Sequence, residues 1–167
     1  MIVALVIFLI FIAVFGVGVL FGAPFLPTRK KWVDDALTLA NVGSKDVVVD
    51  LGSGNGVVLR QALKKGAKKV VGYEINPLLV ILSRLRLKKF GWRAKIIDRD
   101  FFKVDLPPET TVIYLFPVER VVKRLPDFLE QQRPRLKAKE IRLVVFSYPV
   151  PGIKPTKTLN GMSLYEI

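Results

Sequence analysis

A glycine-rich stretch directly after a short apolar run constrains the fold of this chain more than any other feature. The run Val47–Val49 leads into Asp50 and then into Gly52, Gly54 and Gly56. A buried strand that ends in such glycines and continues as a helix is typical of an α/β sheet with a nucleotide-like ligand. Glycines let the backbone turn sharply and approach the ligand, and the first turn of the helix offers free N–H groups. Other nucleotide-binding folds use such a turn, and some loops of this kind are merely tight, so the turn alone leaves the ligand open.

The spacing of the glycines narrows the ligand. Dinucleotide-binding loops read G-x-G-x-x-G, whereas residues 52–56 read G-x-G-x-G, with an acid two residues before the first glycine. This form resembles motif I of the class I S-adenosylmethionine (SAM) methyltransferases. The resemblance implies SAM as the cofactor, with the loop backbone against its methionine part and Asp50 orienting the loop and the ammonium group. The residues predicted to bind the cofactor here are Asp50, Gly52, Ser53, Gly54 and Gly56.

Two further acids follow predicted strands. Glu74 comes about twenty residues after the loop, where an acid can accept hydrogen bonds from both ribose hydroxyls. A solvated glutamate at a strand end is the weaker alternative because of this spacing. Beyond the next strand, Asp100 is placed to accept from the adenine amino group and Phe101 to pack on the ring. A turn acid and a core aromatic remain open alternatives for these two residues.

Apolar runs alternate with helical patterns along the rest of the chain, which predicts an α/β fold with a Rossmann-like, doubly wound and mostly parallel sheet. The expected strands are 46–51, 69–74, 94–97, 111–116, 142–148 and 163–167. The expected helices are 32–40, 56–65, 77–90 and 117–136, the last interrupted by Pro126 and Pro134. A chain of 167 residues has no room for a separate substrate-binding domain.

The N-terminal segment predicts a membrane anchor. Residues 1–28 contain no charged residue, and a basic cluster begins at Arg29. About 20 such residues span a hydrocarbon core of roughly 30 Å. A cleaved signal peptide fits less well, because no basic residue precedes the apolar run. We therefore expect a single-pass transmembrane helix within 1–26, a methyltransferase domain over 27–167, and that domain on the cytoplasmic side of the membrane.

Charge and two missing residue types limit the chemistry. The 27 Lys and Arg against 14 Asp and Glu give a net charge of +13, which favours anionic lipid or nucleic acid, or merely keeps a small domain soluble. The chain has no histidine and no cysteine. This excludes a disulfide, a Cys/His metal site, a thiol nucleophile and an imidazole base, and no metal is expected. A 5-methylcytosine transferase, which needs a cysteine nucleophile, is excluded with them.

Several segments together resemble one family. They are Pro24–Thr28, the Asp50 glycine loop, Gly72–Pro77 with its continuation to Arg86, Tyr148–Pro151 and Lys154–Pro155. The chain is similar to the small membrane-associated lysine methyltransferases that modify the c-type subunit of ATP synthase and the adenine nucleotide translocase in mitochondria, and to their prokaryotic relatives. The resemblance implies a protein lysine as methyl acceptor. Its implied cofactor residues are Thr28, Asp50, Gly52, Gly54, Glu74, Asn76 and Asp100.

The acceptor side carries weaker signals. Tyr114, Phe116, Tyr148 and Pro149 are candidates for an acceptor channel, where aromatic faces favour a methylammonium group, but each is equally well a core residue. No catalytic residue is assigned. The prokaryotic relatives often have an acidic or polar residue where Ser147 and Tyr148 stand, so the resemblance leaves the substrate open.

The leading hypothesis is a SAM-dependent protein lysine methyltransferase anchored in the membrane through residues 1–26, acting on a membrane-associated protein. An RNA methyltransferase is the first alternative, motivated by the net charge of +13. The absence of an RNA-binding appendage counts against it, and nucleic acid is not an expected partner. A non-catalytic SAM-binding protein at the membrane is the second alternative.

Overall fold

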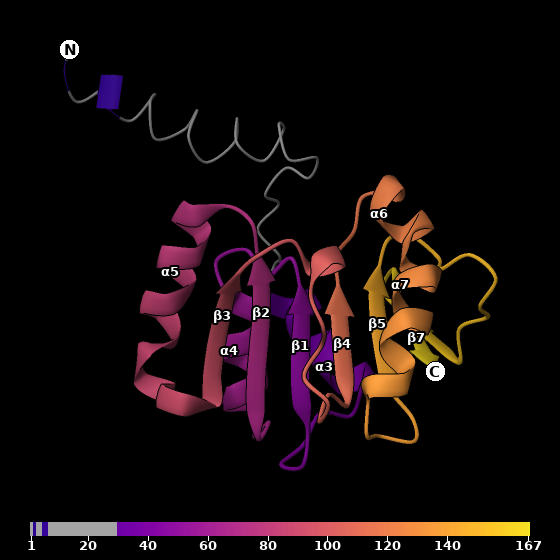
Figure 1. Cartoon of the computed structure of the whole chain (residues 1–167). Coiled ribbons are helices and arrows are strands. Elements are labelled where there is room, and N and C mark those ends of the chain that lie inside the picture. Colours follow the sequence, from indigo (N-terminus) through magenta and orange to yellow (C-terminus); the bar gives the residue numbers. More distant parts are fainter. Residues whose placement is uncertain (1, 3–4, 7–29) are drawn as a thin grey trace.

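The protein is built around one sheet of seven strands, in the order β3-β2-β1-β4-β5-β7-β6 (Figure 1). The computed structural model describes residues 2, 5–6 and 30–167. Strands β1 to β5 pair in parallel, whereas β7 is antiparallel to both β5 and β6. The predicted α/β, mostly parallel and doubly wound sheet is thereby confirmed. Its order reverses direction at β1 and β4, which is where open α/β sheets bind ligands.

The described elements follow each other along the chain as the alternating pattern predicts. They are α3 (Lys30–Leu39), β1 (Val47–Leu51), α4 (Val57–Lys64), β2 (Lys69–Glu74), α5 (Pro77–Leu87), η2 (Lys88–Arg93), β3 (Ala94–Asp98), η3 (Phe101–Lys103), β4 (Val112–Leu115), α6 (Glu119–Lys123), α7 (Leu125–Gln132), η4 (Arg133–Arg135), β5 (Arg142–Phe146), β6 (Lys157–Leu159) and β7 (Met162–Glu166).

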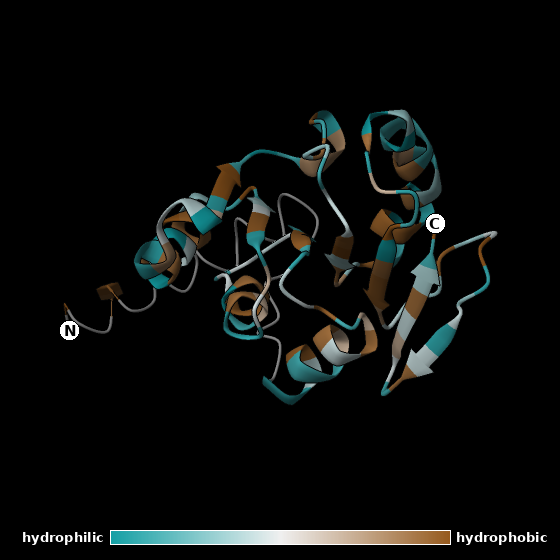
Figure 2. Cartoon of the chain, turned by 90° about the horizontal axis from the view of Figure 1, so that it is seen from below, coloured by the Kyte–Doolittle hydropathy of each residue, from teal (hydrophilic) through white to brown (hydrophobic). Residues whose placement is uncertain are grey.

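Two apolar layers hold the helices against the sheet. Successive strand residues point to opposite faces, so Val48 lies in the layer under α3, α4 and α5, and Val49 in the layer under α6 and α7. Burial on both faces explains why the central strands read as continuous apolar runs. Seen from below, the helices carry both brown and teal sides, as expected for elements with one buried face (Figure 2).

Differences from the expected elements have local causes. The predicted helix over 117–136 is two short helices and a 3₁₀ turn, with Pro126 in the first turn of α7 and Pro134 in the first turn of η4. Proline has no N–H and fixes φ, so it ends one helix and suits the start of the next. Strand β6 was not predicted, because all three of its residues are exposed and carry no apolar alternation.

An ion pair ties the sheet together at the amino ends of its parallel strands. Arg142 of β5 pairs with Asp46, which also accepts hydrogen bonds from Thr111 Oγ1 at 2.7 Å and from the Gly43 amide at 2.8 Å. Arg142 donates in addition to the carbonyl of Ala40, at 2.6 Å, just after α3. These polar contacts join segments of the protein to one another at the amino ends of the strands, whereas open α/β sheets bind ligands at the carboxyl ends.

Within residues 2, 5–6 and 30–167, no helix is both long enough and apolar enough to cross a bilayer. Most of the predicted anchor, 1–26, lies outside the described residues.

Candidate functional site

The glycine loop turns over the carboxyl end of β2 and leads into α4. Gly52, Gly54 and Gly56 all have positive φ, at 103°, 53° and 77°, where side chains other than glycine are strained. The amides of Gly52 and Ser53 donate to the Tyr73 carbonyl at 3.0 and 2.8 Å. A Cβ at Gly52 would meet no atom within 4 Å. The loop therefore leaves open space along its backbone at the edge where the strands end.

Gly72 brings β2 unusually close to this loop. A Cβ there would lie 2.6 Å from Ser53 Oγ, 2.7 Å from Ser53 Cβ and 2.6 Å from Leu59 Cδ1. From the sequence, Gly72 is only one member of a family motif, and no role is predicted for it. A glycine inside an apolar strand is the signal that could have identified it, because it often marks a close approach of two backbones.

Gly56 has a similar role at the start of α4. Its Cβ would lie 2.4 Å from Oγ of Ser83, a residue of α5 that is fully buried. Gly56 thus lets α4 pack closely on α5 and holds the left-handed conformation at the N-cap. In the sequence, Ser83 belongs to the family motif that continues to Arg86, but no role is predicted for it.

The Glu74 carboxylate connects the loop to the start of α5. It is 8% exposed; Oε2 accepts from the Gly54 amide at 2.8 Å, and Oε1 accepts from the amides of Ile75 at 3.0 Å and Asn76 at 2.8 Å. All three donors are backbone groups. The residue predicted to bind ribose hydroxyls therefore also fixes the loop.

Asp50 is a buried acid beside Glu74. Burial raises the pKa of its carboxyl well above the ordinary range, and repulsion from Glu74 raises it further. Within the described residues, no hydrogen bond to this carboxylate offsets the loss of water. A buried carboxylate in this state binds a cationic group favourably, because the cation lowers the cost of its charge.

Asp50→Asn is expected to stabilise the protein without ligand above neutral pH, and to weaken SAM binding. The pKa of the Asp50 carboxyl is higher in the folded protein than in the unfolded chain, where it is about 4. The contribution of this group to the free energy of unfolding is therefore complete below pH about 4 and is lost as the pH rises through the folded-state pKa. Asparagine stays neutral throughout. In urea unfolding, the free energy of unfolding of the variant relative to the parent should be larger at pH 8 than at pH 5. The same pH dependence of this free energy in both proteins would contradict the prediction.

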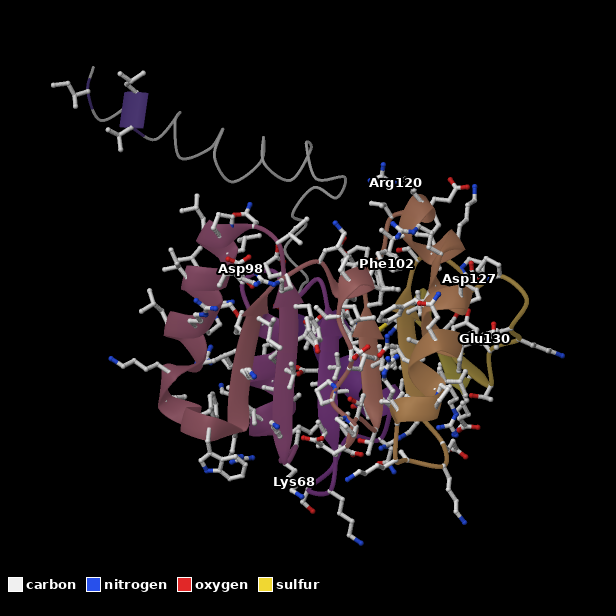
Figure 3. All side chains as sticks on the ribbon, viewed as in Figure 1. Lys68, Asp98, Phe102, Arg120, Asp127 and Glu130 are labelled. Atoms are coloured by element: carbon white, nitrogen blue, oxygen red, sulfur yellow. The ribbon has the colours of Figure 1, made fainter. Side chains whose placement is uncertain are left out.

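The remaining predicted cofactor residues have local partners. Asn76 caps α5, its Oδ1 accepting from the amides of Leu78 and Leu79 at 3.0 and 3.4 Å. Asp100 similarly caps η3 through the Phe102 amide at 3.0 Å. Figure 3 labels Asp98 and Phe102 near the upper end of the sheet, where the parallel strands end. Thr28 lies outside the described residues.

Aromatic rings fill the space after β3. Phe101 lies 4.3 Å from Phe102 and 5.7 Å from Phe128, measured between ring centroids, and the guanidinium of Arg124 covers Phe102 at 3.9 Å. Phe101 keeps partial exposure. Phe101 thus packs in this ring cluster and also keeps part of its ring exposed to solvent. Its packing on adenine stays a prediction.

The acceptor-channel candidates are spread from core to surface. Tyr114 is 3% exposed and pairs in register with Asp50 of β1. Phe116 packs edge-on against Phe146, at 4.6 Å between centroids. Tyr148 is 39% exposed, and the next residue, Pro149, is exposed as well. A shared channel among them stays a prediction.

Ser147, which separates β5 from Tyr148, has strained backbone. Its φ is 68°, the Tyr148 amide donates to the Phe146 carbonyl at 2.9 Å, and the Ser147 amide donates to the Gly161 carbonyl at 2.8 Å. Such strain costs of order 1–3 kcal/mol and persists only where surrounding contacts impose it. The hairpin of β6 and β7 therefore determines where the residues after β5 project.

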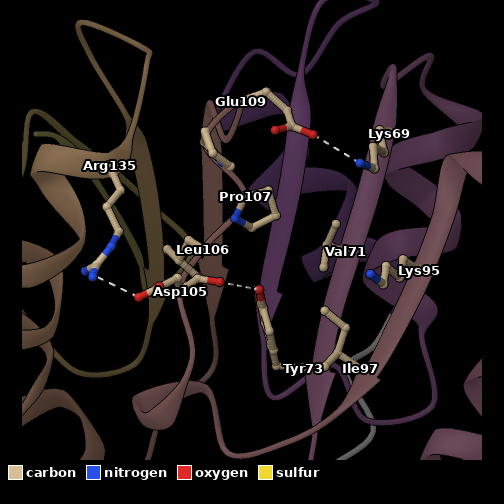
Figure 4. A pocket seen from close by; sticks show the side chains of 11 residues that line it. Lys69, Val71, Tyr73, Lys95, Ile97, Asp105, Leu106, Pro107, Glu109 and Arg135 are labelled. Carbon is tan, nitrogen blue, oxygen red and sulfur yellow. Dashed lines mark hydrogen bonds and ion pairs between the residues drawn. The ribbon is translucent and has the colours of Figure 1, made fainter.

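A separate hollow of about 650 Å³ lies over β2 and β3, away from the glycine loop (Figure 4). Two ion pairs bridge its rim, Lys69 with Glu109 at 3.0 Å and Arg135 with Asp105 at 3.3 Å. Burial, and then Asp105, raise the pKa of Tyr73 to about 12, and the Tyr73 hydroxyl donates to the Asp105 carbonyl at 3.2 Å. None of the predicted cofactor residues lines this hollow, so it is distinct from the candidate site.

The residues at the loop fit SAM by their chemistry. Asp50 is buried and, within the described residues, its carboxyl accepts no hydrogen bond, which suits a ligand with an ammonium group. The open space beside Gly52 leaves room for the methionine part of the ligand. Glu74 is at the strand end where ribose is bound in such sheets.

Sequence comparison finds related proteins over most of the chain. Residues 50–157 match the family model described as the ANTKMT methyltransferase domain. A protein-lysine N-methyltransferase of Saccharolobus islandicus (strain REY15A) is 34% identical over 141 residues, covering 82% of this chain and 84% of that protein. The human lysine N-methyltransferase named for the C-type subunit of ATP synthase is 31% identical, covering 79% of this chain and 54% of that protein. This chain thus spans little more than half of the human relative.

Solved structures agree in fold. An RNA methyltransferase from Salinibacter ruber in complex with S-adenosyl-L-homocysteine superposes with a TM-score of 0.73 at 32% identity, covering 84% of this chain and 92% of that one. The putative methyltransferase yhhF from Escherichia coli gives a TM-score of 0.69 at 17% identity, covering 86% and 89%, which concerns the fold alone.

Proposed function

Since the chain belongs to the family of the ANTKMT methyltransferase domain and is a SAM-dependent methyltransferase, we propose that its acceptor is the side-chain amine of a lysine in a protein. The supporting observation is the 34% identity to a protein-lysine N-methyltransferase over 84% of that protein. The relatives named for an ATP synthase subunit and for adenine nucleotide translocase support the same acceptor.

Asp50, Glu74 and the glycine loop are proposed to hold the cofactor. Asp50 binds the ammonium group, Glu74 the ribose hydroxyls, and the backbone of Gly52 to Gly54 the methionine part. Asp100 would accept a hydrogen bond from the adenine amino group, and Phe101 would pack on the adenine ring. SAM supplies an electrophilic methyl group on sulfur, which the lysine nitrogen takes while the carbon–sulfur bond breaks and its electrons go to sulfur.

The protein's own contribution to this reaction is to position the amine and to exclude water. A lysine amine must be neutral to react, and burial beside a cation lowers its pKa without a dedicated base. This suits a chain with no histidine and no cysteine. Tyr148 and Pro149, exposed after the strained Ser147, are proposed to contact the acceptor chain, and Tyr114 and Phe116 to border it from β4.

A bilayer anchor is proposed for residues 1–26, with the 27–167 domain on the cytoplasmic side. The uncharged N-terminal sequence and the basic residues from Arg29 onward support it. Anchoring raises the effective concentration of the enzyme near a membrane-embedded acceptor, which replaces a recognition domain.

The test is transfer of labelled methyl groups from SAM to membrane proteins of a strain that lacks the enzyme. We expect label in protein, on lysine by mass spectrometry, with the full chain and not with Asp50→Ala. Glu130 is an exposed residue of α7. Its variant Glu130→Gln is the matched control and should transfer as much label to protein as the parent does. Absence of label in any protein would overturn the proposal.

RNA is the second candidate acceptor. The relative solved with S-adenosyl-L-homocysteine is named an RNA methyltransferase, and this chain has a net charge of +13. Total RNA included in the same reaction distinguishes the two, because label in RNA that resists protease would favour this candidate.

A further inference from the structure

Helix α5 is apolar on two opposite sides. Its buried residues are Leu79, Val80, Ser83 and Leu87. At 100° per residue, Leu78, Ile81, Leu82 and Leu85 lie on the opposite side of the helix, and they are 37%, 53%, 49% and 64% exposed. An ordinary surface helix would carry polar residues there. In Figure 1, α5 lies at the β3 edge of the sheet, and the described domain leaves its outer side uncovered.

Two more exposed apolar residues flank α5 in the sequence. Ile75, just before the helix, is 37% exposed, and Trp92 in η2 is 76% exposed. We call the set Ile75, Leu78, Ile81, Leu82, Leu85 and Trp92 the outer face. Contiguous exposed apolar residues of this kind usually mark a contact surface.

The segment that carries the outer face is rich in cations, and two acids bound it, the buried Glu74 and the exposed Asp98. Residues 75–97 contain no acid and include six cations, Arg84, Arg86, Lys88, Lys89, Arg93 and Lys95. Arg84 and Arg93 donate to backbone carbonyls, and none of the six forms an ion pair with a carboxylate of the described residues. Arg86 lies close enough to Arg60 of α4 for mutual repulsion. The cations therefore still need negative partners.

We propose that the outer face of α5 lies on an anionic lipid bilayer, with its aliphatic side chains and Trp92 in the headgroup region and the exposed cations Arg84, Lys88 and Lys89 facing lipid phosphates. Amphipathic helices bind membranes by this combination of apolar area and basic residues, an anionic leaflet attracts nearby cations, and tryptophan favours the interface. A second copy of the chain is a poor occupant, because symmetric contact would bring together two sets of exposed cations. The proposal is independent of the acceptor's identity.

Trp92 provides the test, because the chain has only one other tryptophan, Trp32, which packs on Phe146 at 5.1 Å. The full chain is reconstituted in vesicles of phosphatidylcholine with 30% phosphatidylglycerol, or of phosphatidylcholine alone, with brominated acyl chains as quencher. In Trp32→Phe, we expect Trp92 fluorescence to shift to the blue and to be quenched in the anionic vesicles, and less so at high salt. In Trp92→Phe, the remaining Trp32 should stay unquenched.

Surface variants test the two contributions separately. Ile81→Ser with Leu85→Ser, and Lys88→Gln with Lys89→Gln, should each reduce Trp92 quenching in Trp32→Phe at least threefold. Leu159→Ser on β6 and Lys137→Gln with Lys139→Gln are matched changes at other exposed positions and should have no effect. Unquenched Trp92 in vesicle-bound protein would overturn the proposal. The proposal would also be overturned if the parent protein formed a dimer without vesicles and the double variant Ile81→Ser with Leu85→Ser were a monomer. The outer face would then be the contact with a second copy of the chain.

Discussion

Gly72→Ala is expected to lower the free energy of unfolding by about 1–3 kcal/mol and to weaken SAM binding at least tenfold. The new methyl group would overlap Leu59 and the side chain of Ser53, which lies within the glycine loop. The Leu59 side chain can turn aside, but Ser53 Cβ at 2.7 Å moves only with the loop backbone. Because the loop is predicted to hold the cofactor, stability and affinity should fall together. Urea unfolding and calorimetry with SAM measure the two effects.

Two further variants give this prediction its controls. Ser53→Gly in the Gly72→Ala protein removes both contacts with Ser53, whose Oγ has no hydrogen-bond partner among the described residues, and should restore much of the affinity. Gly43→Ala introduces a methyl group with no atom within 4 Å and should bind SAM as the parent does. If Gly72→Ala alone bound SAM normally, the close approach of β2 to the loop would have no part in shaping the site.

Glu74→Gln should weaken SAM binding by about ten- to a hundredfold, and should also destabilise the protein without ligand. Among the described residues, the two carboxylate oxygens accept only from backbone N–H groups, those of Gly54, Ile75 and Asn76. A glutamine amide must turn its NH₂ toward one of these donors, which leaves a buried donor unpaired at a cost of about 1–3 kcal/mol. Either the loop or the start of α5 is then displaced.

The comparison with Asp50→Asn makes this result specific. Both changes replace a buried carboxyl group with an amide, yet Asp50→Asn is expected to raise the unfolding free energy at pH 8 and Glu74→Gln to lower it. Glu130→Gln, at an exposed position on α7 (Figure 3), should change neither quantity. Equal shifts in Glu74→Gln and Asp50→Asn would mean that net charge near the loop, rather than these hydrogen bonds, determines its stability.

The sheet was predictable because it is buried on both faces. Strands β1 and β4 are fully buried, so Val47–Val49 and Val112–Leu115 each read as an unbroken apolar run, and the helices between them follow from their one apolar side. Strand β6 could not be predicted, since its exposed residues pair through backbone atoms with β7 and leave no side-chain pattern.

The residues expected on the donor side have clearer sequence signals than those on the acceptor side, and their contact with SAM stays a prediction. Gly52, Gly54 and Glu74 stand at fixed spacing behind their strands, and backbone geometry demands those residue types. The role of Gly72 depends on which atoms lie opposite it, and the strain at Ser147 on a hydrogen bond to Gly161, fourteen positions later. Contacts between distant segments do not show in a local pattern.

The hairpin of β6 and β7 also orders the assembly of the site during synthesis. Chains emerge from the ribosome N-terminus first and tend to fold in that direction. The glycine loop, Asp50 and Glu74 lie on segments that precede β3, whereas Ser147 is held by Gly161 and β5 pairs with β7. A nascent chain can therefore complete the methyl-donor side first, and it fixes the loop after β5 only once β7 has left the ribosome.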